Sequence, residues 1–205
     1  MRGLVKGALV LGLALAMASA VQAQQRGRGF GLGAMLQNES VQKELKLTDE
    51  QKTKLREALE KVRDNHKDDL AKLRDLSNEE RQKLLRTVAE ESQKAIAGVL
   101  DEKQMKRFKQ IGWQASGANA LNDPDVQKTL KLSDEQKKKL QDIIADSNRK
   151  MREAFQGGAG AREKIQEIRK ETQEKANGVL TDEQKKSWKE MQGAPFEFQF
   201  QRRQQ

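Results

Sequence analysis

Few side chains in this 205-residue sequence could do bond-making chemistry. The chain has one histidine, His66, and contains neither cysteine nor tyrosine. It therefore offers no thiol nucleophile, no multi-histidine metal site and no Glu-x-x-His pair for a di-iron helical bundle. His66 is in register with Val62 and Leu70 at helical spacing, which is typical of a residue on an apolar helix face. We predict a protein without enzymatic activity, metal or cofactor.

Neighbouring acids, such as Asp68 with Asp69 or Glu90 with Glu91, resemble the carboxylate pairs of acid–base catalysts. On a helix, however, consecutive side chains point about 100° apart. Two carboxylates that are adjacent in sequence therefore cannot act together on one substrate atom. We interpret these acids as solvated helix faces with ion-pair partners.

Basic side chains are more numerous than acidic ones, with 40 Lys and Arg against 31 Asp and Glu and a formal net charge of +9. Two basic clusters lie within or just after a repeated helix start. They are Lys103, Lys106, Arg107 and Lys109, and Lys137, Lys138 and Lys139. Such clusters could form a cationic surface for acidic or unfolded proteins, although solvated helix faces often have the same composition. Nucleic acid is a weaker candidate, because no aromatic residues are interleaved with the charge.

Helices must position these side chains, and a repeated segment marks where the helices begin. The pattern Leu-Thr/Ser-x-x-Gln occurs three times, and a looser copy has Asp at the second position. The Thr or Ser hydroxyl can accept from the backbone N–H three residues on, while the Gln reaches back to the cap's own N–H. Each copy therefore predicts a helix start, with the preceding Leu as a hydrophobic staple. The residues of the four copies are Leu47, Thr48 and Gln51; Leu100 and Gln104; Leu132, Ser133 and Gln136; and Leu180, Thr181 and Gln184.

The chain also contains an internal repeat. Residues 41–55 and 126–140 are identical at 12 of 15 positions, at an offset of 85. Downstream, Leu100 recurs as Leu180, at an offset of 80. The second copy has thus lost five residues, which we place near residues 156–160, at the tip of a predicted helical hairpin.

The predicted fold class is all-α. Apolar spacings of three and four residues predict long helices over residues 49–75 and 77–99, with a shorter helix on either side. The repeat predicts the same order of short, long, long and short helix in the second half. Because each coiled-coil-like apolar seam is narrow, we expect the two hairpin units to pack as a pseudo-two-fold extended bundle or cradle.

The termini are predicted to lie outside this fold. Residues 1–23 combine a basic start, a short apolar run and small residues at the end, which is typical of a signal peptide cleaved after Ala23. Cleavage near Ala20 and a retained membrane anchor are the alternatives. The predicted segments are a signal peptide (1–23), a flexible Gly/Arg-rich N-terminus (24–37), two helical repeat units (38–118 and 119–192) and a flexible Phe/Gln-rich tail (193–205).

The tail has its own pattern, because Phe196, Phe198 and Phe200 alternate with polar residues. A period of two predicts an extended segment. Such a segment could be disordered, could add a strand to a partner's sheet edge, or could occupy the protein's own groove.

The repeated Leu-Thr/Ser-x-x-Gln pattern resembles the LTxxQ motif of the Spy/CpxP family of bacterial periplasmic proteins. The likeness covers most of residues 38–192 and is carried by Leu47, Thr48 and Gln51 and by their repeats. The resemblance implies an exported helical protein with ATP-independent chaperone activity or a role in envelope stress. Family members usually contain one hairpin system per chain and dimerise, whereas this chain contains two. The histidine clusters of zinc-responsive relatives are missing, and the motif identifies no client-binding residue.

We therefore expect a periplasmic or secreted binding protein that shields unfolded envelope proteins and that could form homo-oligomers, without stable membrane insertion after signal cleavage. The alternative is a structural or regulatory envelope protein that docks on one specific partner. An exported chain without cysteine has no disulfides, so its stability must come from helix packing.

Overall fold

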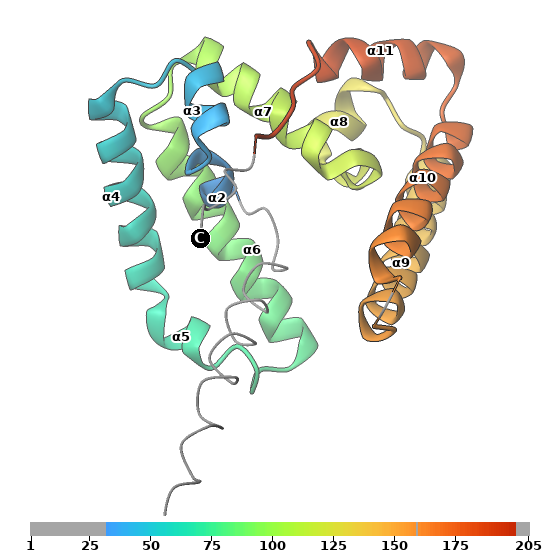
Figure 1. The fold of residues 1–205 in the computed structure, drawn as a ribbon, viewed down its shortest axis with the longest axis horizontal. Coiled ribbons are helices and arrows are strands. Elements are labelled where there is room, and N and C mark those ends of the chain that lie inside the picture. The colour runs from blue at the N-terminus through green and yellow to red at the C-terminus, as the bar shows by residue number, and fades with distance from the viewer. Residues whose placement is uncertain (1–31, 159, 200–205) are drawn as a thin grey trace, which may run out of the picture. The chain divides into compact units, whose positions relative to one another are not determined.

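The computed structural model describes residues 32–158 and 160–199. The predicted signal peptide and residues 24–31 lie outside the described residues. The described part of the chain is all-α and contains no β-strand, which confirms the predicted fold class (Figure 1). No helix in this part is long and apolar enough to cross a membrane. In chain order the helices are α2 (Leu32–Leu36), α3 (Glu39–Glu44), α4 (Asp49–Asn65), α5 (Lys67–Ala71), α6 (Asn78–Ala97), α7 (Glu102–Ser116), the 3₁₀-helix η1 (Gly117–Asn122), α8 (Pro124–Thr129), α9 (Asp134–Gln156), α10 (Ala161–Val179) and α11 (Asp182–Gln192).

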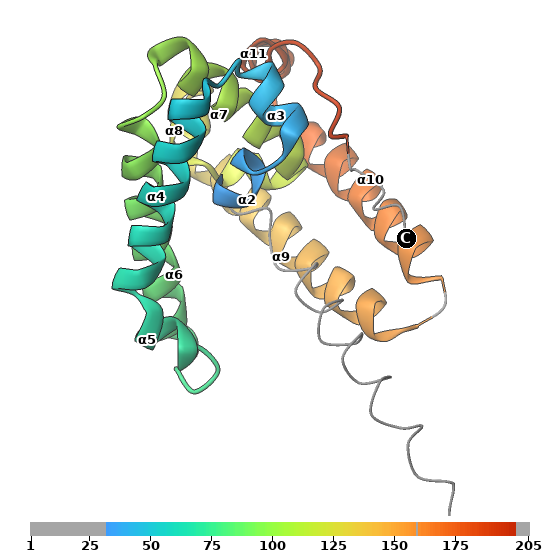
Figure 2. The same cartoon turned by 60° about the vertical axis from the view of Figure 1, so that its left-hand side comes forward.

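Two helix pairs make the most extensive contacts between elements. Helix α4 packs against α6 in the first half of the chain, and α9 packs against α10 in the second half. Both views show α5 and the first turns of α6 at the same end of the first pair (Figures 1 and 2). Residues 157–160 connect α9 to α10 in the region where the sequence repeat places its deletion.

Helix α2 lies within residues 24–37, which the sequence predicted to be a flexible N-terminus. Met35 and Leu36 are 2% and 3% exposed and belong to the first core cluster. Burial of these two side chains holds the segment in place. The folded part of the chain thus begins at least as early as Leu32.

The predicted single helix over residues 49–75 is interrupted at His66. Helix α4 ends at Asn65, and the backbone of His66 leaves the helical region with φ −113° and ψ 14°. Asn and His are weak helix formers, and Asp68 and Asp69 stabilise the N-terminus of the following α5. The His66 Nε2 atom lies 2.9 Å from Glu91 Oε2 on α6, so the only histidine bridges two helices.

The buried apolar side chains form three clusters. The first joins α2, α3, α4, α6 and α7, and the second joins η1, α8, α9, α10 and α11. The third is smaller and lies between the end of α9 and α10, with Ala154, Ile165 and Ile168. The first and second clusters correspond to the two halves of the sequence repeat.

Helix α7 contributes to both large clusters. Its Phe108 and Ile111 are buried in the first cluster, whereas Trp113 packs against the second. The Trp113 ring lies 6.2 Å from the ring of Trp188, and its Nε1 donates to Asp123 Oδ2 at 3.3 Å. The helix ends at Gly117, whose φ of 56° suits glycine.

Short helices α3 and α8 end in the same way, 85 residues apart. After α3, Lys46 has a φ of 50°, its N–H donates to Lys43, and the N–H of Leu47 donates to Gln42. After α8, Lys131 and Leu132 make the equivalent bonds, and Lys131 also has a φ of 50°. These are Schellman motifs with lysine at the position that glycine favours.

Candidate functional site

The repeated motif forms two-way caps in all four copies. In the first copy, Thr48 Oγ1 accepts from the N–H of Gln51 at 3.1 Å, and Gln51 Oε1 accepts from the N–H of Thr48 at 3.2 Å. Asp101, Ser133 and Thr181 make the same exchange with Gln104, Gln136 and Gln184. The Leu before each cap is at most 7% exposed. The predicted helix starts at the four copies are therefore confirmed.

The two motif glutamines of the first repeat also bind each other, which the sequence analysis missed. Gln51 Nε2 donates to Gln104 Oε1 at 2.7 Å, and Gln104 Nε2 donates to Gln51 Oε1 at 3.1 Å. The second N–H of each amide reaches a backbone carbonyl, that of Val99 at 3.1 Å and that of Leu45 at 3.1 Å. The amide pair therefore ties α4, α7 and the ends of α3 and α6 together.

The second repeat builds the same pair from Gln136 and Gln184. Gln136 Nε2 donates to Gln184 Oε1 at 2.7 Å and to the carbonyl of Val179 at 2.9 Å. Gln184 Nε2 donates to Gln136 Oε1 at 3.1 Å and to the carbonyl of Leu130 at 3.1 Å. The two halves thus share tertiary contacts as well as sequence.

Each amide in these pairs uses its full hydrogen-bonding capacity. A glutamine amide has two N–H donors and an oxygen with two acceptor sites. Gln51 donates to Gln104 and Val99 and accepts from Thr48 and Gln104. A saturated pair of this kind fixes the arrangement of the helices but leaves no group free to bind a ligand. We therefore assign the motif residues a structural role.

The predicted basic clusters are largely paired within the protein. Arg107 binds Glu44 and Lys109 binds Asp125, each at 2.7 Å, and these partners come from other helices. Lys137 and Lys139 pair with acids of their own helix, Asp134 at 2.9 Å and Glu135 at 2.8 Å. The exposed Lys103, Lys106 and Lys138 form no ion pair with the described residues. These three cations can therefore meet an acidic partner without giving up an ion pair within the protein.

Two large apolar side chains are prominently exposed. Leu85 on α6 is 45% exposed, and Phe155 near the end of α9 is 64% exposed. Along α6, only Ile96 is buried, while Leu84 and Val88 are half-buried. The apolar seam of the first helix pair is therefore incompletely covered in its outer half. We refer to Leu85 and Phe155 as the exposed apolar pair.

The outer half of the second helix pair is better packed. Thr172 Oγ1 donates to Ser147 Oγ at 2.8 Å or to the carbonyl of Ile168 at 2.6 Å, and both hydroxyl residues are buried. Both buried hydroxyl groups are hydrogen-bonded, so hydrogen bonds compensate for the water that they lose on burial. Phe155 lies outside this packing, beside the third cluster in sequence.

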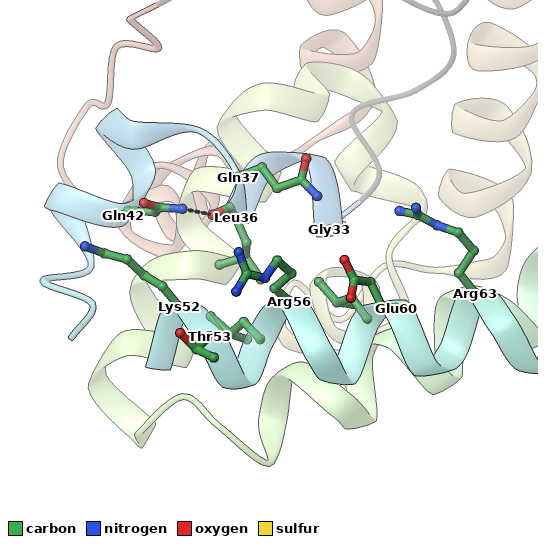
Figure 3. Close-up of a pocket in the computed structure, with 11 residues that line it drawn as sticks. Gly33, Leu36, Gln37, Gln42, Lys52, Thr53, Arg56, Glu60 and Arg63 are labelled. Carbon is green, nitrogen blue, oxygen red and sulfur yellow. Dashed lines mark hydrogen bonds between the residues drawn. The ribbon is translucent and has the colours of Figure 1, made fainter. Parts of the chain in front are cut away.

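A cavity of about 280 Å³ lies between α2, α3 and α4 (Figure 3). Apolar side chains from Leu36, Leu55 and Leu59 line it, and Gly33 approaches Leu59 closely. Figure 3 shows Arg56, Glu60 and Arg63 along α4 on the opposite side from Gln37. Arg56, Arg63 and Glu60 form no ion pair with the described residues, so the two guanidinium groups outweigh the one carboxylate and leave the lining with a net positive charge.

Metal chemistry has no candidate site among residues 32–158 and 160–199. No group of three or more His, Cys, Asp or Glu side chains there is arranged to hold an ion.

Comparison of the chain with protein-family models, with curated proteins and with solved structures gives no match.

Proposed function

We propose that this chain is an exported, non-enzymatic binding protein that holds unfolded envelope proteins without ATP, in the manner of Spy/CpxP proteins. The exposed apolar pair carries the proposal. Leu85 and Phe155 present apolar area that folding leaves in contact with water. Arg86 and Arg152 flank them in sequence, on helices rich in charge. Apolar side chains that are exposed within a charged surface offer small apolar contacts, which suit weak and reversible binding of many unfolded chains better than one tight interface.

We further propose that the two halves are tandem hairpin units related by a pseudo-two-fold axis. The matching glutamine pairs, Gln51 with Gln104 and Gln136 with Gln184, support this relation. So do the matching Schellman motifs at Lys46 and Lys131. On this proposal, the internal duplication takes the place of the dimerisation that is usual in the family.

Aggregation of a denatured client tests the function. We expect the purified protein to slow aggregation of a urea-denatured client in the absence of ATP. The double variant Leu85→Ser/Phe155→Ser should lose at least half of this effect, because it removes apolar area without altering the core. Ala89→Ser, at an exposed position of α6, is the matched control and should behave as the unmodified protein.

No effect of the unmodified protein at several-fold molar excess would refute the proposal. If the double variant and the control were equally active, the function would not depend on the exposed apolar pair. Circular dichroism of each variant excludes unfolding as the reason for a loss.

Docking on one specific envelope partner is the second candidate, and the cavity in Figure 3 favours it. A preformed hollow with an apolar wall and two unpaired guanidinium groups, on Arg56 and Arg63, suits one acidic segment better than many unfolded chains. Cross-linking in cells distinguishes the two functions, because a chaperone captures many proteins and a docking protein captures few.

A further inference from the structure

The chain after α11 returns to the first half of the molecule. Residues 193–199 form neither helix nor strand, and they run from α11 toward α2 and α3 (Figure 1, red). Phe196 and Phe198 pack against the first core cluster, although they follow the last helix of the second repeat. The described part of the tail thus packs against the protein itself. Phe200 lies outside the described residues.

Side chains of the first repeat hold this segment by its backbone. Gln114 Oε1 accepts from the N–H of Phe196 at 2.8 Å, and its Nε2 donates to the carbonyls of Ala194 at 2.9 Å and Gln192 at 2.6 Å. Arg107 Nη1 also donates to the Ala194 carbonyl, at 2.8 Å. Every peptide bond offers a carbonyl, and every residue except proline offers an N–H. Recognition through these atoms is therefore largely independent of sequence.

The far end of the segment is held in the same way. Ser40 Oγ accepts from the N–H of Gln199 at 3.3 Å, and Asn38 Nδ2 donates to the Gln199 carbonyl at 3.3 Å. Asn38, Ser40, Arg107 and Gln114 thus bracket an extended peptide at both ends. We call these four residues the tail groove.

Along the bound segment, half-buried side chains against the protein alternate with side chains exposed to solvent. Phe196 and Phe198 are half-buried, whereas Glu197 and Gln199 are exposed. The two rings contact each other edge to face at a centroid distance of 4.9 Å. The segment therefore places its aromatic side chains against the protein and its polar side chains in solvent.

The tail groove belongs to the first repeat alone. At the repeat offset of 80, Arg107 and Gln114 correspond to Ser187 and Ala194, which cannot make the same hydrogen bonds. The duplication therefore does not explain the presence of Arg107 and Gln114. Gly193 makes the entry to the groove possible, because its φ is 67° and a Cβ there would collide with the Gln110 amide.

We propose that the tail groove is a binding site for extended segments with aromatic residues at alternate positions, and that residues 194–199 occupy it as an internal competitor. The proposal rests on the proposed function. Among envelope proteins, the strands of transmembrane β-barrels have this pattern, since apolar and polar residues alternate and aromatic residues line the membrane interfaces. The partner is an unfolded strand of such a barrel.

The contacts of the tail would allow it to be released and replaced by another segment. Its hydrogen bonds lie at partly exposed positions and its rings are only half-buried, so local release is inexpensive compared with unfolding. A tethered competitor nevertheless acts at an effective concentration on the order of millimolar. The groove therefore responds only to abundant or tightly binding segments.

Peptide binding by the full-length protein tests the proposal. The probe is a fluorescent peptide of alternating Phe and Gln, and the control peptide has the same composition with adjacent Phe residues. We expect the variant Phe196→Ser/Phe198→Ser, whose tail is released, to bind the alternating peptide at least about tenfold more tightly than the unmodified protein. Glu197→Ser, at an exposed tail position, should leave the affinity unchanged.

The groove itself is tested in the released background. Adding Gln114→Leu should weaken binding about tenfold, because it removes the donor and acceptor that read the peptide backbone. Equal affinity of the released and unmodified proteins, or equal binding of both peptides, would overturn the proposal. Thermal unfolding confirms that each variant is folded; if Gln114→Leu unfolds the protein, Ser40→Ala replaces it.

The outcomes separate this inference from the proposed function. If the unmodified protein slows aggregation but no variant binds the peptide, the groove proposal fails and the chaperone proposal stands. If the released variant binds the alternating peptide but no form of the protein slows aggregation, the chaperone proposal fails. The released variant should also protect a denatured β-barrel protein more strongly than a denatured helical one; equal protection would contradict the assigned partner.

Discussion

Each motif glutamine performs two tasks with one amide. Gln51 closes the cap of α4 through its oxygen and joins that helix to α7 through its nitrogen. A glutamate could perform the first task but not the second, because a carboxylate has no N–H to donate. The choice of Gln over Glu at this position therefore reflects the tertiary contact.

Gln51→Glu should destabilise the protein by about 1–3 kcal/mol, because Gln104 Oε1 and the Val99 carbonyl both lose their donor. Urea unfolding measures the change. The matched control is Glu80→Gln in the cap of α6, where the N-cap residue Ser77 is the only hydrogen-bond partner of the Glu80 side chain within the described part of the chain. That change should cost less than Gln51→Glu, because it leaves no buried group without its donor. Losses of equal size would show that the glutamine pair adds nothing to the cap.

Lys46 and Lys131 hold a backbone conformation that suits glycine, with φ 50° in each. We expect Lys46→Gly and Lys131→Gly to raise the free energy of unfolding by about 0.5–1 kcal/mol each, since glycine relieves the left-handed strain. Thermal unfolding reports the change. Lys61→Gly, inside α4, should instead lower stability by about 1 kcal/mol. A loss at all three positions would contradict this interpretation.

At the scale of elements, the first turns of the repeated helices share an electrostatic arrangement. A hydrogen bond from Lys52 holds the pKa of Asp49 below its usual value, and Lys137 and Lys185 do the same for the pKa values of Asp134 and Asp182. At the α6 cap, hydrogen bonds from Ser77 lower the pKa of Glu80. These acids are exposed, so each contributes little by itself.

Groups with lowered pKa in the folded state stabilise it above their unfolded pKa and cease to do so as they are protonated. We therefore expect the thermal midpoint to stay nearly constant from pH 8 to about pH 5 and to fall below about pH 4. Calorimetry across this range, in low salt, provides the measurement. A midpoint that rises on acidification would have the opposite sign and would refute the arrangement.

Helix starts could be predicted from the sequence because capping is local, with every partner three residues away. The pairing of Gln51 with Gln104 could not, because it depends on how α4 meets α7. The break at His66 was hidden for a similar reason, since its apolar register continues through Val62 and Leu70 while its ring bonds to Glu91 on another helix. The spacing of apolar residues shows which face of a helix is buried, but it does not show where the helix is interrupted.

At the scale of the whole molecule, sequence reasoning found the two repeats but not how the terminal segments join them. Residues 32–36 pack through Met35 and Leu36, and residues 193–199 are held by side chains from the first repeat. Neither segment has a strong helical pattern of its own. Their placement depends on receiving groups such as Gln114, whose role is invisible without the contacts it makes.

Each half of the chain is held by its own glutamine pair, whereas Leu85 and Phe155 remain exposed. On this view, binding of an unfolded protein involves the outer ends of the helix pairs and leaves the capped ends unchanged. If the proposed chaperone function holds, the cavity between α2 and α4 takes no part in it.

Hydrogen–deuterium exchange with a denatured client present tests this claim most directly. We expect slower exchange in the first half of α6 around Leu85 and at the end of α9 around Phe155, with no change at the four motif helix starts. Protection confined to the cavity lining around Arg56 and Arg63, or no protection anywhere, would contradict the account.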